Sequence, residues 1–165
     1  MANKTLILDQ EKIALKLQRM AFQIWEENPD EKRITLAGIA GNGVFVAKEL
    51  SRILQEISDI QVNLRTIEVD KQEHLQSIET VNWNLENETI VLVDDVANSG
   101  KTLLYAMRPL LSFKLKKIMI AVLIDRTHKS FPVVPDIIGH SIATTLQDHI
   151  AVSCEKERLK AVHLM

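Results

Sequence analysis

The chain has 165 residues, of which 46% are apolar and 25% are charged. This composition is that of a globular protein and excludes wholesale disorder and a collagen-like fibre. The length fits a single hydrophobic core, so we expect one domain over residues 1–165. Because 20 basic residues nearly balance 22 acidic ones, for a net charge of -2, no overall positive field favours nucleic acid or a membrane surface as a partner.

The single cysteine and the short apolar runs indicate the cellular compartment in which we expect the protein. Cys154 has no second cysteine to pair with, so the chain forms neither an internal disulfide nor a cysteine-based zinc cage. The longest apolar runs, such as residues 118–124, are far shorter than a membrane span, and the first residues contain no signal-peptide core. We expect a cytoplasmic protein with no membrane partner.

Helical and strand patterns alternate in the first part of the chain. Apolar residues recur at helical spacing over residues 9–28, behind Asp9 as an N-cap. An apolar run over 34–39, the glycine turn at 41–43 and a second helical pattern over 46–57 predict a strand, a tight turn and a helix.

The next segment begins as a strand and then loses its pattern. Residues 62–69 alternate as in a strand but change phase midway, which indicates a bulge or a strand end. Between Glu68 and Glu88 no clear period follows, and six acidic residues accompany only Lys71 as a base. We therefore expect a surface hairpin or mobile flap at approximately 68–88.

The middle of the chain holds its most apolar strand pattern. A continuous β-branched run over 89–93 predicts a central parallel strand covered on both faces. Asp94 and Asp95 follow it at once, and a loop over 96–100 and a helix over 103–111 are expected next.

The last part of the chain completes an α/β pattern. A further buried strand is expected over 118–124, with loops and short strands such as 150–152 in the remainder. Strands that alternate with helices at this spacing predict an α/β fold with a doubly wound, mainly parallel sheet and right-handed crossovers.

Residues 89–102 have the layout of a phosphate site. In an open parallel sheet, ligands bind beyond the carboxyl ends of the strands, where loops and helix N-termini meet. A helix that begins near Ser99 points unpaired N–H groups and its positive dipole end at an anion. Ser99 and Thr102 add hydroxyl donors, and Gly100 admits a close backbone approach. The segment therefore predicts a phosphate cradle.

The two acids before this cradle indicate what accompanies the phosphate. Adjacent carboxylates at a strand end are costly unless hydroxyls or a cation meet them, so Asp94 and Asp95 suggest a polyol, a divalent metal or both. An isolated Asp-Asp pair more often starts a turn and caps a helix. The strand before this pair and the cradle after it favour a ligand, and phosphate with polyol indicates a phosphorylated ribose.

Two other nucleotide-binding patterns fit less well. Residues 100–102 mimic the end of a P-loop, but Asp95 stands where that motif needs its first glycine. Residues 41–43 resemble part of a dinucleotide fingerprint, but Val46 stands at the third glycine position. Neither a nucleoside-triphosphatase nor a Rossmann oxidoreductase is favoured.

Residues 90–102, Ile-Val-Leu-Val-Asp-Asp-Val-Ala-Asn-Ser-Gly-Lys-Thr, resemble the phosphoribosyl pyrophosphate (PRPP) motif of the type I phosphoribosyltransferases. The chain is also similar to the bifunctional pyrimidine operon attenuation protein and uracil phosphoribosyltransferase family, in segments over 7–9, 38–43, 123–132, 135–139 and 142–145. The resemblance implies a type I fold with a small flap or hood. It also implies transfer of a 5-phosphoribosyl group from PRPP to a nitrogenous base, uracil-like by preference, with release of pyrophosphate.

The resemblance assigns a role to several segments. Asp94 and Asp95 would bind the ribose hydroxyls at the catalytic centre and hold Mg²⁺ indirectly, together with PRPP. The implied PRPP-binding residues are Asp94, Asp95, Ala97, Asn98, Ser99, Gly100, Lys101 and Thr102. The implied pyrophosphate loop is Ala40, Gly41, Asn42 and Gly43, and the implied base pocket is Asn98, Asp125, Ile137 and Ile138.

The chain departs from the family pattern at three places. Ala40 and Asn42 stand where the pyrophosphate loop usually carries basic residues, and residues 67–75 lack the usual arginine of the mobile loop. Both departures predict weakened turnover. Asn98 stands where purine-salvage relatives usually hold an aspartate that faces the base, so purine salvage is disfavoured.

The expected partners are PRPP, a nucleobase or nucleoside monophosphate, and further copies of the chain in a homodimer or higher oligomer. RNA binding is possible but not favoured, because the densest basic cluster, Lys114, Lys116 and Lys117, is more typical of a solvated helix end. The alternative function is a catalytically weak regulator that senses nucleotides or binds RNA and keeps the PRPP fold.

Overall fold

A parallel sheet of five strands forms the centre of the protein, in a computed structural model that describes residues 4–69, 83–145 and 148–165. The strand order is β3-β2-β4-β5-β6, and every neighbouring pair is parallel. The strands are β2 (Arg33–Ile39), β3 (Gln61–Ile67), β4 (Thr89–Ala97), β5 (Lys117–Arg126) and β6 (Ile137–Ile142). The most apolar strand, β4, lies in the middle, as expected of a strand covered on both faces.

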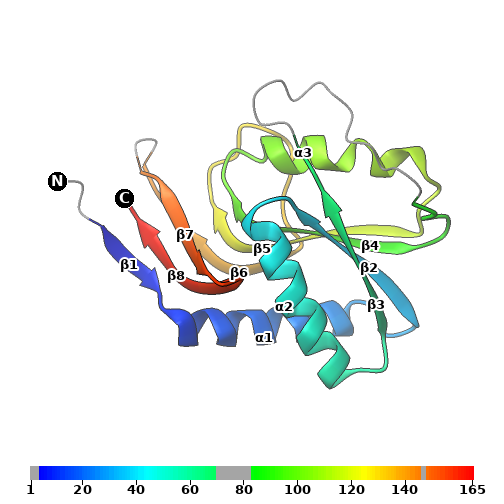
Figure 1. Ribbon diagram of the computed structural model, residues 1–165. Helices are drawn as coiled ribbons and strands as arrows, with labels where there is room; N and C mark the ends of the chain where they lie inside the picture. Colours follow the sequence, from blue (N-terminus) through cyan, green and yellow to red (C-terminus); the bar gives the residue numbers. More distant parts are fainter. Residues whose placement is uncertain (1–3, 70–82, 146–147) are drawn as a thin grey trace.

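Helices cover both faces of this sheet (Figure 1). On one face lie α1 (Gln10–Glu26) and α2 (Asn42–Ile57), and on the other lie α3 (Lys101–Met107) and the short 3-10 helix η1 (Leu110–Ser112). Each face has its own buried apolar cluster, the first built on the two long helices and the second on α3 and η1. The fold is therefore the doubly wound α/β type that the sequence predicts.

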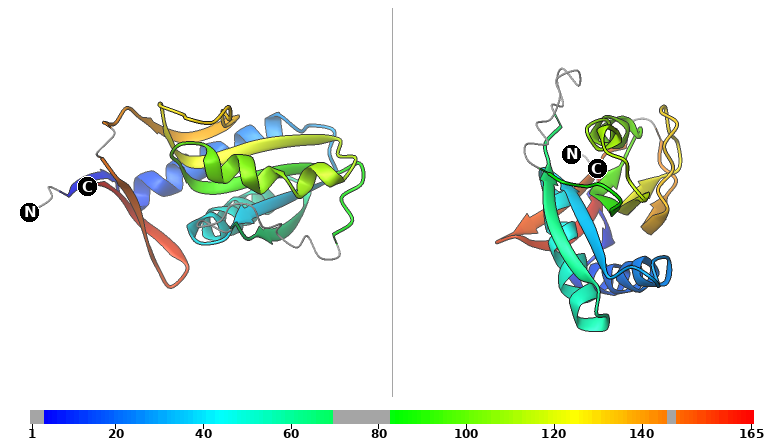
Figure 2. Two further views of the ribbon diagram at one scale, coloured as in Figure 1. Left: turned by 90° about the horizontal axis from the view of Figure 1, so that it is seen from above. Right: turned by 90° about the vertical axis from the view of Figure 1, so that its right-hand side faces the viewer.

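A small antiparallel sheet stands beside the central one (Figures 1 and 2). Its order is β1-β8-β7, from β1 (Thr5–Leu8), β7 (Ile150–Glu155) and β8 (Arg158–Leu164). It joins the two ends of the chain, since Thr5 pairs with Leu164. The sequence predicts only a short strand at 150–152 here, because a pairing between distant segments leaves no local pattern.

Three predicted boundaries were wrong. β4 continues through both acids to Ala97, because its ladder with β5 extends to the pair Ala97 and Asp125. α2 begins at Asn42, because Gly41 makes the turn alone with a φ of 103°. The predicted helix over 103–111 ends at Met107, since Pro109 cannot continue an α-helix and starts η1 instead.

Two other expectations concern β3 and the segment after it. β3 pairs with β2 in an unbroken register through Ile67, so the change of phase marks neither a bulge nor a strand end. Val62 packs against the first apolar cluster and Ile67 lies in the second, so the buried face of the strand changes along its length. Residues 70–82 of the predicted flap lie outside the described residues. Trp83 and Leu85 follow them and pack against the second apolar cluster, where Leu85 is almost completely buried.

A network of ion pairs closes the amino-terminal edge of the sheet. Glu31 accepts a hydrogen bond from Thr89 Oγ1 at 3.2 Å and pairs with Lys116, 2.5 Å away. Glu88 pairs with Arg33 at 2.8 Å and accepts from Thr35. The hydrogen bond from Lys116 is the main cause that holds the pKa of Glu31 below its ordinary value.

We predict that Glu31→Gln lowers the free energy of unfolding at pH 7 by about 0.5–1 kcal/mol, since Lys116 is half exposed and screened by solvent. A carboxyl whose pKa is lowered by folding stabilises the protein above its ordinary pKa, and this contribution disappears as the pH falls through the lowered value. The two proteins should therefore converge in urea titrations at acidic pH. Glu27→Gln, at an exposed carboxyl nearby, is the control; a difference that persists in acid would contradict the prediction.

Candidate active site

A cavity of about 440 Å³ lies at the carboxyl end of the central sheet. It is bounded by the start of α2, the end of β4 and the edge of β7. Its lining residues are Ile39, Ala40, Gly41, Asn42, Asp94, Asp95, Val96, Asn98, Thr102, His149, Ile150, Ala151 and Val152. The fold thus brings the acid pair and the predicted pyrophosphate loop to one cavity, where open α/β sheets bind their ligands.

Backbone hydrogen bonds and close packing orient the two carboxylates. Asp94 Oδ1 accepts from the backbone N–H of Asp95 at 2.9 Å, and Asp95 Oδ1 accepts from that of Val96 at 2.9 Å. Asp94 is 8% exposed. A Cβ at Gly43 would lie 3.0 Å from Asp94 Oδ1 and from the carbonyl oxygen of Val93, so only glycine lets α2 approach β4 this closely.

Asn42 connects three elements around the cavity. Its Nδ2 donates to Asp95 Oδ2 at 3.0 Å and to the carbonyl oxygen of Val152 on β7, also at 3.0 Å. The sequence places Asn42 in a loop that faces pyrophosphate through its backbone. In the structure it is the first residue of α2, and its side chain holds the acid pair and the small sheet together.

The amino-terminal end of α2 faces this cavity without a side-chain cap. Gly41 is the N-cap, and because glycine has no side chain it makes no capping hydrogen bond to the first amides of the helix. Such amides and the positive end of the helix dipole attract an anion. The amide of Ala40 is already used, because it donates to the carbonyl oxygen of Ile67 at 2.8 Å.

The segment after the acids forms a tight loop into α3. Gly100 adopts the left-handed conformation, with a φ of 83°, and Ser99 Oγ accepts from the amide of Lys101 at 3.3 Å. Of the predicted PRPP-binding residues in this segment, Asn98 and Thr102 line the cavity. The side chain of Ala97 is buried in the second apolar cluster.

The predicted base pocket is only partly assembled. Asp125 pairs with Ala97 across the ladder at the end of β5, near the cavity. Ile137 and Ile138 begin β6, where Ile138 pairs with Val122, which in turn pairs with Asp94. Ile137 is fully buried in the first apolar cluster. Neither isoleucine is among the residues that line the cavity, and their place in a base pocket stays a prediction.

Sequence reasoning missed two parts of the site. The first is β7, which lines one side of the cavity and carries no local signal of that position. The second is Arg126 at the end of β5, which donates to Thr144 Oγ1 at 2.7 Å, to the carbonyl oxygen of Thr145 at 2.8 Å and to Asn98 Oδ1 at 3.4 Å. The sequence could have indicated Arg126 as a site residue, because it is a charged residue close after a predicted buried strand.

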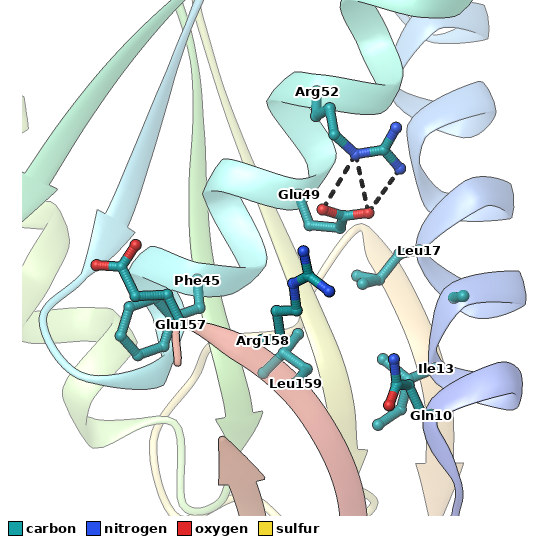
Figure 3. A pocket seen from close by; sticks show the side chains of 10 residues that line it. Gln10, Ile13, Leu17, Phe45, Glu49, Arg52, Glu157, Arg158 and Leu159 are labelled. Atoms are coloured by element: carbon teal, nitrogen blue, oxygen red, sulfur yellow. Dashed lines mark hydrogen bonds and ion pairs between the residues drawn. The ribbon is translucent and has the colours of Figure 1, made fainter. Parts of the chain in front are cut away.

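A second cavity of about 440 Å³ lies between α1, α2 and the hairpin of β7 and β8 (Figure 3). Buried apolar residues such as Leu17 and Leu159 form part of its lining. Glu49 and Arg52 pair across one turn of α2 at 2.7 Å. The hydrogen bonds that Arg52 donates to Glu49 and, second in effect, to Glu56 raise the pKa of Arg52. Its lining includes neither acid of β4, so it is separate from the candidate active site.

Other reactive groups do not form a site among the described residues. Burial raises the pKa of the Cys154 thiol, which therefore stays protonated and weakly nucleophilic at neutral pH. Within residues 4–69, 83–145 and 148–165, no three acidic, histidine or cysteine side chains converge to hold a metal ion. None of the helices in these ranges has the length and apolarity needed to cross a membrane.

Comparison with known proteins identifies the family of this fold and site. Residues 4–155 match the phosphoribosyl transferase domain. The chain belongs to this phosphoribosyltransferase family. The Bifunctional protein PyrR of Citrifermentans bemidjiense is 32% identical over 163 residues, which cover 93% of this chain and 92% of the relative. That of Geobacter sulfurreducens is also 32% identical, over 92% of each chain.

Solved phosphoribosyltransferases share the fold. The hypoxanthine phosphoribosyltransferase of Trypanosoma cruzi superimposes with a TM-score of 0.78 over 95% of each chain, at 14% identity. The hypoxanthine-guanine phosphoribosyltransferase of Bacillus anthracis gives a TM-score of 0.77 over 98% of this chain and 99% of its own, at 19% identity. At such identities the likeness concerns the fold alone.

We predict that Gly43→Ala destabilises this phosphoribosyltransferase by about 1–3 kcal/mol, because the added Cβ overpacks the contact between α2 and Asp94. Thermal unfolding measures the effect. Lys48→Ala, at an exposed side chain on the same helix, is the control for helix composition and should change stability by less than about 0.5 kcal/mol. Equal melting temperatures for Gly43→Ala and the control would contradict the packing argument.

Proposed function

We propose that this protein transfers the 5-phosphoribosyl group of PRPP to a uracil-like base and releases pyrophosphate. The observation that carries the proposal is one cavity in which the acid pair of β4, the uncapped start of α2 and the loop into α3 meet. Phosphoribosyltransferase family membership supports an enzyme at this cavity.

Asp94 and Asp95 are proposed to bind the ribose. A carboxylate oxygen can accept more than one hydrogen bond, so the bonds from the amides of Asp95 and Val96 leave capacity for ribose hydroxyls. These bonds and the bridge from Asn42 hold both carboxylates before the ligand arrives. Reaction at C1 of the ribose depends on such positioning, because the bond that breaks must stay aligned with the incoming base.

The 5′-phosphate and the pyrophosphate of PRPP are proposed to bind at opposite ends of the cavity. The 5′-phosphate would meet residues 97–102, where the backbone turns at Gly100 and Thr102 supplies a hydroxyl. The pyrophosphate would meet Gly41, Asn42 and the amides that follow at the start of α2. The positive helix end would supply part of the charge that basic residues supply in other members of the family.

Mg²⁺ is proposed as the cofactor, bound mainly through PRPP. The residues fit this mode, because two carboxylates face the cavity and no third metal-ligating side chain joins them among the described residues. Protein-bound Mg²⁺ commonly takes one or two carboxylates and completes its shell with water and substrate phosphates. When bound, it supplies charge neutralisation to the leaving pyrophosphate. Among the described residues, the cavity lining includes no lysine or arginine, which supports a low turnover.

Asn98 and Arg126 support a base with carbonyl groups. A guanidinium only donates hydrogen bonds, so Asn98 presents its Oδ1 to Arg126 and keeps its Nδ2 as a donor. The carbonyl oxygens of uracil are suitable acceptors for that donor. RNA binding is less well supported, because Lys116 pairs with Glu31, and Lys117 donates to the carbonyl oxygen of Glu27 at 2.9 Å.

We predict that Asp95→Asn weakens PRPP binding about 10- to 150-fold, the cost of one charge-assisted hydrogen bond. Calorimetry with Mg²⁺ measures the affinity, and pyrophosphate release from PRPP with uracil measures turnover. Guanine, hypoxanthine, adenine and orotate are tested alongside as bases. Asp59→Asn, an exposed acid after the far end of α2, should bind PRPP like the wild type. Unchanged PRPP affinity in Asp95→Asn would refute the assignment.

We predict a homodimer or higher oligomer, because α1 exposes large apolar side chains. Leu15 is 66% exposed, and Phe22 and Trp25 are each 38% exposed on the same helix. Burial of such a face against a second copy would remove this apolar area from water. Light scattering at micromolar concentration should give at least twice the 18.7 kDa mass of the chain, and a monomer mass would contradict the prediction.

A further inference from the structure

The connection from β5 to β6 packs against the loop that precedes α3. The backbone amides of Ser130 and Phe131 both donate to the carbonyl oxygen of Ser99, at 3.1 and 3.0 Å. A Cβ at Gly100 would lie 3.4 Å from the carbonyl oxygen of Phe131 and 3.5 Å from Lys129 Cδ. The connection therefore holds this loop by hydrogen bonds at Ser99, and it lies close enough to Gly100 that an added side chain there would meet it.

Lys129 holds together the turn after β5, which is followed directly by the amides of Ser130 and Phe131. Its Nζ contacts Asp125 Oδ1 and the carbonyl oxygen of Arg126, so one ammonium group joins both sides of the turn that follows β5. The side chains of Lys129 and Asp125 are only 13% and 12% exposed. An ion pair this far from water is held firmly, because the loss of either partner leaves the other poorly solvated.

We propose that Lys129 is a positioning residue for the loop of residues 97–102. This inference rests on the proposed function, in which that loop binds the 5′-phosphate. Lys129 fixes the turn, the turn directs the amides of Ser130 and Phe131 at Ser99, and these bonds hold the loop in one conformation around Gly100. A loop that is already ordered loses less conformational entropy when a phosphate binds.

The inference predicts an effect on one end of the cavity and not on the other. The start of α2, where pyrophosphate is proposed to bind, is held by Asn42 and Gly43 and has no contact with Lys129 among those described above. Loosening of the turn should therefore weaken ligands that carry a 5′-phosphate and spare pyrophosphate. A residue that only stabilises the fold would affect both ligands equally.

The test is calorimetric binding of ribose 5-phosphate and of pyrophosphate, each with Mg²⁺, to the wild type and to Lys129→Met. Methionine keeps most of the apolar stem and removes the ammonium group. Ribose 5-phosphate affinity should fall about tenfold, the effect of one lost hydrogen bond, while pyrophosphate affinity stays within about twofold. Lys116→Met, which breaks an ion pair at the opposite edge of the sheet, is the matched control and should bind both ligands normally.

A double variant separates the loss of the lysine from the exposure of an unpaired acid. Asp125→Asn with Lys129→Met removes both charges, and its ribose 5-phosphate affinity should stay low, because the carbonyl oxygen of Arg126 still lacks its donor. Recovery in this variant, equal loss of both ligands, or normal ribose 5-phosphate binding in Lys129→Met would each overturn the inference. A wild type that binds neither ligand would instead refute the proposed function itself.

Discussion

The close contact between α2 and the end of β4 is the constraint on which the site depends. Two carboxylates follow a buried strand, and Gly43 lets the start of a helix approach one of them to a distance that no side chain would permit. This approach brings the uncapped amides of the helix to the same cavity as the acids. The negative carboxylates and the positive end of the helix thus lie side by side, which suits a ligand that carries both hydroxyls and phosphates.

The parallel arrangement of the strands explains why distant segments share this cavity. The ends of β2, β4 and β5 come to one edge because their ladders run in register. A glycine turn into α2 follows β2, and loops with polar residues follow β4 and β5. The opposite edge carries paired acids and bases such as Glu31 and Lys116. Charges at that edge pair with one another, whereas Asp94 and Asp95 line the cavity in which the substrate is proposed to bind.

Two separate groups of interactions hold the two ends of the cavity in place. Asn42 holds Asp95 and the small sheet, and the turn closed by Lys129 holds the loop around Gly100. Each group acts on a different end of the cavity. Because the two groups are separate, ligand binding at one end can be weakened without a change at the other end and without a movement of the central sheet.

The sequence by itself determined the α/β class, the position of β4 and the polar segment after it. These features depend on local patterns: a continuous β-branched run predicts a buried strand, and acids with small hydroxyl residues predict a turn that binds a ligand. It could not determine the boundaries at Ala97 and Asn42, because strand length follows the ladder with β5 and the helix start follows the turn at Gly41.

Only the tertiary structure decided which residues complete the site. β7 reaches the cavity through antiparallel pairing with β8, and the turn that follows Lys129 reaches the loop before α3 through the amides of Ser130 and Phe131, which donate to Ser99. Contacts between segments this far apart leave no periodic signal in the sequence, because the local pattern of one segment does not indicate which distant segment it contacts.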